Sequence, residues 1–205
     1  QGRFSLLHLP FSLLALVAPV PSALRGAIGV TGSYDLTGRG PLLTTELALE
    51  QARFGEQALR LERQAVVLAS DGLQLDLALR SDGAAEALQV RGSIPLNLRD
   101  ALDLELESHG DALSFLAAPA GDALTLTRGS SDLRLILSGY LDQPQANGFL
   151  VVRDGAFTAA EQSFKNVNAS LLFDFNRVEV SQLAATLESG GSVSAAGAIG
   201  LFTPR

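Results

Sequence analysis

Few side chains in this sequence have the type and spacing that catalysis or metal binding requires. His8 and His109 are the only histidines, and a catalytic triad or a histidine metal site would need a third partner that nothing near either one supplies. The chain has no cysteine, which excludes disulfides, thiolate metal ligands and a cysteine nucleophile. We therefore predict that the chain is not an enzyme and that it has no cofactor and no metal site.

An acidic row at Asp103, Glu105 and Glu107 could be read as a set of calcium ligands. Alternate residues of a strand point to the same face, so these carboxylates form a row and do not converge on one point. We expect a solvated outer face instead. Asn168-Ala169-Ser170 matches the glycosylation sequon, but it lies within an expected strand. The glycines form no phosphate-binding loop, because no helix follows them.

The elements that would position these side chains are short strands. Apolar and polar residues alternate with a period of two, and Gly, Asp, Asn and Pro interrupt them at intervals too short for helices. Residues 73–79 are the clearest case, with Leu at every odd position. Residues 57–61 could form either a strand or one helical turn, and residues 4–20 predict a strand followed by a short helical turn. Other strands are expected at residues 27–34, 45–52, 64–70, 88–98, 101–108, 112–118, 123–127 and 133–138, and in further segments up to residue 201.

An internal repeat organises the chain. Residues 14–98 and 113–203 align so that Phe157 falls on Phe54, Phe173 on Leu68 and Gly197 on Gly92. A chance match between two all-β segments is the alternative. Stacked repeats predict an elongated structure in which each unit contacts mainly its neighbours. We treat residues 1–205 as one segment built from these two repeats.

The apolar residues of these strands predict a continuous aliphatic face, since aromatic residues are only 6% of the chain. A closed sandwich or barrel would bury that face, whereas an open, curved antiparallel sheet would leave an elongated groove with a hydrophobic concave face. Alternation alone does not separate the two, but the repeat and the uniform aliphatic character favour the groove. Roughly thirteen strands would give a groove on the order of 60 Å long. The candidate groove residues are Leu73, Leu75, Leu77, Leu88, Val90, Leu102, Leu104, Leu106, Leu133, Leu135, Leu137, Phe173, Phe175, Val178 and Val180.

The composition narrows the classes of molecule that the chain could bind. The formal net charge of −7 disfavours nucleic acid, because phosphate binding needs clustered Lys and Arg. The apolar run at residues 4–20 contains two prolines and is too short to span a bilayer. The sequence contains no Met, so we expect it to be a piece of a longer polypeptide or a processed product.

Several turn and strand motifs follow one another in the second half of the chain. They are Gln143-Pro144 with Asn147-Gly148-Phe149, Val152-Arg153-Asp154-Gly155, Asn166-Val167-Asn168-Ala169, Phe173-Asp174 with Asn176-Arg177-Val178, and Gly191 with Gly197, Ile199 and Leu201. Their order resembles the repeat of the TamB family, which belongs to the AsmA-like, repeating β-groove proteins. The lead-in at residues 13–19 is similar to members from photosynthetic lineages. The resemblance covers nearly the whole chain.

The resemblance implies a β-taco fold and a role in the cell envelope. The parent protein would be anchored in the inner membrane and cross the periplasm, and its groove would carry phospholipids, through their acyl chains, between the inner and outer membranes. A partner is also implied, an outer-membrane assembly barrel contacted through other parts of the parent chain. The alternative function is a groove or edge-strand chaperone that assists outer-membrane β-barrel assembly or envelope protein translocation.

Overall fold

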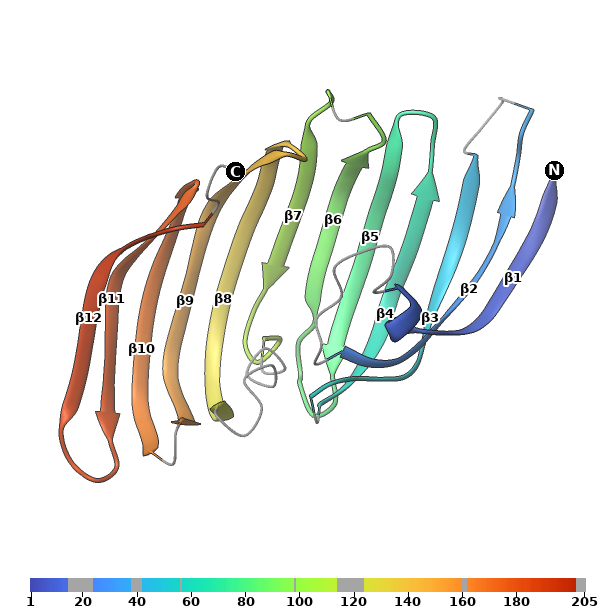
Figure 1. Cartoon of the computed structure of the whole chain (residues 1–205). Helices are drawn as coiled ribbons and strands as arrows, with labels where there is room; N and C mark the ends of the chain where they lie inside the picture. Colours follow the sequence, from blue (N-terminus) through green and yellow to red (C-terminus); the bar gives the residue numbers. More distant parts are fainter. Residues whose placement is uncertain are drawn as a thin grey trace.

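The chain forms one open antiparallel sheet in a computed structural model (Figure 1). The 12 strands follow each other in sequence order from β1 to β12, so every strand pairs with its neighbours in the chain. The structure describes residues 1–14, 24–37, 42–55, 57–97, 99–113, 124–159 and 162–201. The predicted all-β, open antiparallel sheet is therefore confirmed, and the sheet does not close into a barrel.

Short turns connect most of the strands, as the Gly-rich and Asp-rich segments predict. At the turn formed by residues 69–72, for example, the Ala69 amide donates to the Gly72 carbonyl oxygen at 2.9 Å. The elements are β1 Gly2–Pro10, α1 Phe11–Leu14, β2 Leu24–Tyr34, β3 Leu43–Phe54, β4 Gln57–Leu68, β5 Gly72–Ser81, β6 Leu88–Pro95, β7 Leu102–Ser108, β8 Leu124–Tyr140, β9 Gln143–Ala159, β10 Gln162–Phe175, β11 Arg177–Leu187 and β12 Ser192–Gly200.

The strand and short helical turn expected near the N-terminus are β1 and α1, and residues 57–61 are part of strand β4. The segments 123–127 and 133–138 were expected as two strands, but residues 124–140 form the single strand β8. The strand expected at residues 112–118 is wrong at its start, because Ala112 and Leu113 lie in a turn, and the rest of it lies outside the described residues.

Cross-strand pairing divides the side chains of the sheet between two faces, because directly paired residues point to the same side. Leu77 pairs with Val90, Val90 with Leu106, and Leu106 with Leu135. We call the side that carries these residues the aliphatic face. The opposite side carries the paired residues Arg91 and Glu105, and we call it the charged face.

Two groups of strands, β2–β4 and β8–β11, are longer than the other strands, and they bend where the pairing register shifts. Gly26 in β2 and Gly129 in β8 have φ angles of 107° and 136°, and Gln51 in β3 and Asp154 in β9 have φ angles of 48° and 50°. The alignment that places Phe157 on Phe54 also places Gly129 on Gly26 and Asp154 on Gln51. Bulges of this kind bend a strand and increase its twist. The bends therefore recur at aligned positions of β2–β3 and β8–β9.

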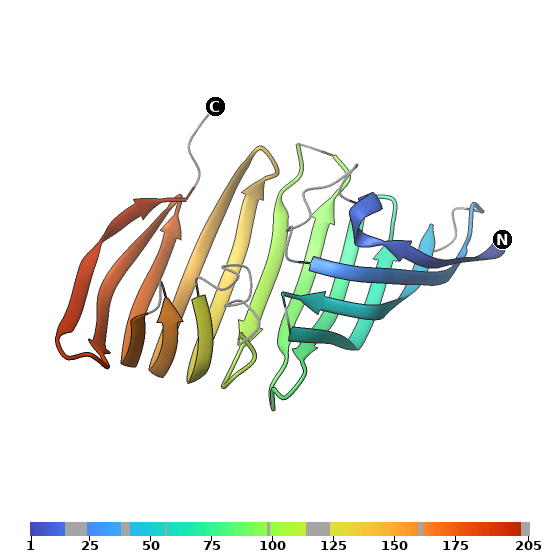
Figure 2. The same ribbon diagram turned by 60° about the horizontal axis from the view of Figure 1, so that its bottom comes forward.

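The bent N-terminal strands fold over the aliphatic face. Figure 2 shows β2 and parts of β3 and β4 turned across the sheet, with α1 above it. Phe11 of α1 packs in one cluster with Phe54, Leu59 and Leu88, and Leu113 of the turn after β7 joins the same cluster. The hydrophobic core thus lies along one margin of the aliphatic face, where these segments cover the strand ends.

Candidate functional site

All the candidate groove residues predicted from the sequence lie on the aliphatic face. In its centre, Leu104 pairs with Gly92 on one side and with Leu137 on the other. Farther along, Phe173 pairs with Gly148 and Val178. The paired register thus joins strands β5 to β11 into one continuous apolar surface. Their function as a groove stays a prediction. The predicted residues lie in β5 (Leu73, Leu75, Leu77), β6 (Leu88, Val90), β7 (Leu102, Leu104, Leu106), β8 (Leu133, Leu135, Leu137), β10 (Phe173, Phe175) and β11 (Val178, Val180).

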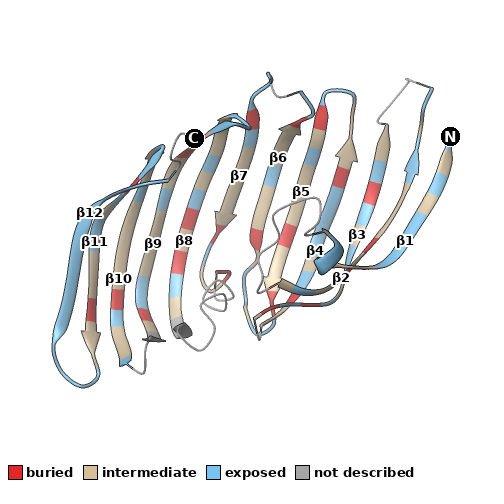
Figure 3. Cartoon of the chain, in the orientation of Figure 1, coloured by how far each residue is buried: buried red, intermediate tan, exposed pale blue. Residues whose placement is uncertain are grey.

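Burial across this surface is graded (Figure 3). Leu88 and Leu133, which lie under the cover that Phe11 and Leu113 provide, are 9% and 8% exposed. Most other groove residues, including Leu104, are only half-buried. A residue of a closed core would be covered on all sides. Within the described part of the chain, no second sheet covers the groove residues. The alternative of a closed sandwich is therefore wrong.

The sequence-based selection missed several members of this surface. Leu150 pairs with Leu133 and Leu171, and Leu79 pairs with Leu61 and Leu88. The partners in these pairs all point to the aliphatic face; they are Leu61, Leu88, Leu133 and Leu171. Leu79 continues the uninterrupted alternation of Leu73, Leu75 and Leu77, so the sequence contained the signal for it. Leu61 is less evident, because a register shift between Leu61 and Arg63 changes the parity of the alternation in β4.

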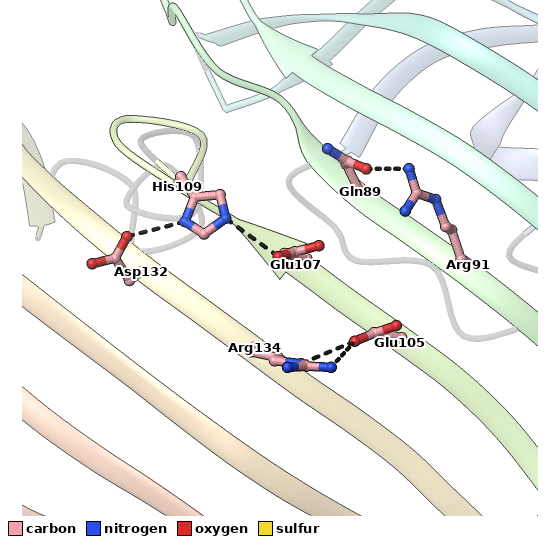
Figure 4. Close-up of polar contacts among 7 residues, drawn as sticks. All are labelled: Gln89, Arg91, Glu105, Glu107, His109, Asp132 and Arg134. Carbon is pink, nitrogen blue, oxygen red and sulfur yellow. Dashed lines mark hydrogen bonds and ion pairs between the residues drawn. The ribbon is translucent and has the colours of Figure 1, made fainter.

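Ion pairs across neighbouring strands stabilise the charged face. The Asp76 carboxylate accepts from the guanidinium groups of Arg63 and Arg91, each at 3.3 Å. The Glu105 carboxylate accepts from Arg134 at 3.0 Å (Figure 4). Opposite charges on paired strands favour this register and leave the face hydrated. This arrangement agrees with the expectation that Asp103, Glu105 and Glu107 belong to a solvated outer face.

His109 lies between two carboxylates at the end of β7. Its Nδ1 atom is 3.1 Å from Asp132 Oδ1, and its Nε2 atom is 3.3 Å from Glu107 Oε1 (Figure 4). The hydrogen bond with Asp132, and then that with Glu107, raises the pKa of His109 above its ordinary value of 6.5. Arg153 also contacts Asp132, and hydrogen bonds from Arg153 and His109 lower the pKa of that carboxyl group.

This cluster has no feature of a reaction centre. Both ring nitrogens of His109 are engaged by carboxylates, so neither is free to accept a proton from a nucleophile. The other histidine, His8, pairs with Glu50 at 2.7 Å on a different part of the sheet. Across the described ranges, no three His, Asp or Glu side chains come together in a way that could hold a metal ion.

A small apolar cluster on the charged face was not anticipated from the sequence. Phe149 and Leu172 pair directly across β9 and β10 and are 42% and 47% exposed. Ile136 on β8 lies two residues beyond Arg134, the direct partner of Phe149, and is 38% exposed. Scattered exposed apolar residues are normal on protein surfaces, so three of them define no site.

Comparison with known proteins adds no further information. No family model, no curated protein and no solved structure matches this chain. The resemblance to the TamB family therefore stays a prediction. Within the described residues, none of the helical structure has the length and apolar character that crossing a membrane requires.

Proposed function

We propose that the aliphatic face binds the acyl chains of phospholipids, and that the chain is one segment of a longer envelope protein that carries them. In this proposal the parent protein is anchored in the inner membrane and extends across the periplasm. Lipid moves along the apolar floor toward the outer membrane, with its acyl chains on the aliphatic face and its headgroup in water.

The observation that supports this proposal is the continuous aliphatic surface, which the described residues cover only along one margin. Leu77, Val90, Leu106 and Leu135 form one unbroken row across four strands, and each is only half-buried. An exposed apolar surface of this length is a liability in water unless a ligand covers it. Burial of acyl methylene groups would contribute about 0.8 kcal/mol each.

The shape of this surface suits a flexible chain better than a compact ligand. The continuous surface runs across the strands from β5 to β11, and a strand spacing of about 4.8 Å gives it a length on the order of 30 Å. Its side chains are nearly all Leu and Val, which offer few polar groups to orient a specific ligand. Such a surface would bind acyl chains at many equivalent positions and would allow movement along its length.

Native mass spectrometry of the gently purified chain tests the proposal, together with uptake of a fluorescent phospholipid from vesicles of phosphatidylethanolamine and phosphatidylglycerol. We expect co-purifying phospholipid and saturable uptake. A lipid-free chain that takes up no labelled lipid would contradict the proposal.

The alternative chaperone function predicts a different result in hydrogen exchange. A peptide from an outer-membrane β-barrel would protect the amides of an edge strand, β1 or β12, because those strands have one unpaired side. Lipid binding would instead protect the central strands around Leu104. Protection by the peptide without any effect of lipid would favour the chaperone.

A further inference from the structure

The turn at residues 109–113 connects the two faces of the sheet at the end of β7. His109 directly follows β7, and its side chain lies between Glu107 and Asp132 on the charged face. Leu113, at the other end of the turn, belongs to the hydrophobic cluster on the aliphatic face. The turn therefore passes around the end of the sheet, and its first and last side chains are held on opposite faces.

The last two residues of this turn are buried. Ala112 has no exposed surface, and Leu113 is 9% exposed. Leu113 lies in the same cluster as Leu88 and Leu133, which are two of the predicted groove residues. Movement of the turn away from the sheet would therefore uncover Leu88 and Leu133 and extend the accessible part of the aliphatic face.

Hydrogen bonds hold the middle of the turn on both sides. The Ser131 amide of β8 donates to the Gly110 carbonyl oxygen at 2.6 Å. On the other side, the Asp111 carboxylate accepts from the amides of Ala85 and Glu86, at 2.9 and 3.1 Å, in the loop before β6. The contacts of the His109 side chain add to these, and histidine is the side chain that ordinarily changes its charge near neutral pH.

Both ring nitrogens of His109 face carboxylate oxygens. Nδ1 is 3.1 Å from Asp132 Oδ1, and Nε2 is 3.3 Å from Glu107 Oε1 (Figure 4). A carboxylate only accepts hydrogen bonds, so both contacts are hydrogen bonds only when both nitrogens carry a proton, as in the charged imidazolium. A neutral ring keeps one N–H group and directs a lone pair at the other carboxylate. Loss of the proton thus replaces one hydrogen bond with a repulsive contact.

Carboxylates outnumber arginines in the elements around His109. The carboxylates are Glu105 and Glu107 on β7, Asp132 on β8, Asp111 in the turn and Glu86 in the loop before β6, and the arginines are Arg91 on β6, Arg134 on β8 and Arg153 on β9. Each of the three arginines already contacts a carboxylate. These surroundings favour a positive ring, and the hydrogen bonds with Asp132 and then with Glu107 raise the pKa of His109.

We propose that residues 109–113 form a pH-dependent clasp, in which protonated His109 holds the turn on the charged face and loss of the proton loosens the cover that Leu113 provides on the aliphatic face. The clasp is closed below the raised pKa of His109 and loosens as the pH rises through it. Ion pairs at exposed positions are weak, and the contacts of Gly110 and Asp111 remain. We therefore expect the turn to open on the order of threefold more often, without complete release.

Hydrogen exchange of the lipid-free chain measures this opening. The Ser131 amide reports it, because its acceptor is Gly110 of the turn, and the Leu96 amide, which donates to Asp71 at the opposite margin, is the internal control. After correction for the intrinsic pH dependence of exchange, the protection of Ser131 should fall about threefold between about pH 6 and about pH 9, and that of Leu96 should stay constant. Constant protection of Ser131 would overturn the proposal.

Substitutions of His109 separate its charge from its packing. His109→Gln carries no charge, so the protection of Ser131 should be low at both pH values. His109→Arg keeps a positive charge, so the protection should stay high at both. His8→Gln is the matched control, because His8 pairs with Glu50 on a different part of the sheet, and it should keep the pH step. A step that persists in His109→Gln, or that disappears in His8→Gln, would overturn the proposal.

The effect of the clasp on lipid rests on the proposed function. If the aliphatic face binds acyl chains, uptake of labelled phospholipid by the unaltered chain should rise between about pH 6 and about pH 9, and uptake by His109→Arg should not. The two proposals fail separately. A pH step at Ser131 in a chain that takes up no lipid would contradict the proposed function and support the clasp, whereas lipid uptake without any step at Ser131 would overturn the clasp alone.

Discussion

Gly92 packs so closely against Asp103 that a Cβ atom on Gly92 would overlap the Asp103 carbonyl oxygen. The same relationship recurs between Gly148 and the carbonyl oxygen of Arg134. Both glycines have positive φ angles, 130° and 145°. Both are paired with residues of the aliphatic face in the middle of the sheet, Gly92 with Leu75 and Gly148 with Leu135. Close approach of neighbouring backbones at these positions therefore depends on the absence of a side chain.

The first prediction is that Gly92→Ala destabilises the sheet strongly. The new methyl group must displace the β7 backbone, and the residue must keep an unfavourable φ angle, so we expect a loss of about 2 kcal/mol or more. Urea unfolding followed by circular dichroism measures it. Gly190→Ala is the control, because Gly190 also has a positive φ angle, 98°, but open space around it. A control variant as unstable as Gly92→Ala would contradict the role of backbone packing.

The second prediction separates an open groove from a closed core. Leu104→Asp should leave the chain folded, because Leu104 is only half-buried and water can reach the new carboxylate. In a closed core the buried charge would cost several kcal/mol and unfold the chain. The variant should lose binding of labelled phospholipid. Asp103→Leu, which changes the neighbouring exposed position on the charged face, should bind lipid normally. A Leu104→Asp variant that binds lipid like the unaltered chain would count against the groove.

The third prediction concerns the pH dependence of the His109 cluster. The folded-state pKa of His109 lies above its ordinary value of 6.5, so its contribution to stability is complete below about pH 6.5 and is lost as the pH rises through the raised pKa. NMR titration of the His109 ring should show this elevated pKa. Asp132→Asn should lower it more than Glu107→Gln, because the hydrogen bond with Asp132 is the larger cause. Equal titration curves in both variants would contradict this assignment.

The fourth prediction is that Ser108→Ala is neutral or stabilising. Ser108 is 1% exposed, and its hydroxyl oxygen is buried with no hydrogen-bond partner within the described structure. A buried polar group without a partner carries an uncompensated desolvation cost, so removing it should stabilise the fold by up to about 1 kcal/mol. The paired variant Thr45→Val removes a buried hydroxyl that does donate, to the Val66 carbonyl oxygen at 3.0 Å, and it should destabilise the fold. Thermal unfolding of both variants checks the difference.

The regular strands could be predicted from the sequence because their side chains alternate without interruption. Residues 73–79 form part of β5 as expected, and the groove residues in β5, β6 and β7 share one face without a register shift between these strands. The bends could not be predicted in the same way. Gln51 and Asp154 adopt positive φ angles although neither is glycine, and tertiary pairing holds them there.

The cover over one margin of the aliphatic face was also missed. Phe11 and Leu113 belong to short segments with no periodicity of their own, so their sequences give no sign of the surface on which they pack. The length of β8 was missed because its alternation breaks at Gly129, where the strand bends and continues. In each case the local sequence is consistent with several structures, and contacts between distant segments select one of them.

The simple order of the strands has a consequence for how such a protein can change length. Each strand pairs only with its neighbours in the chain, and no connection crosses another strand. A hairpin can therefore be inserted or deleted at a turn, such as Leu141-Asp142, without breaking the pairing on either side. Gene duplication of strand pairs would lengthen the sheet in steps of roughly 10 Å. Natural selection could thus adjust the span of the protein without redesigning its interior.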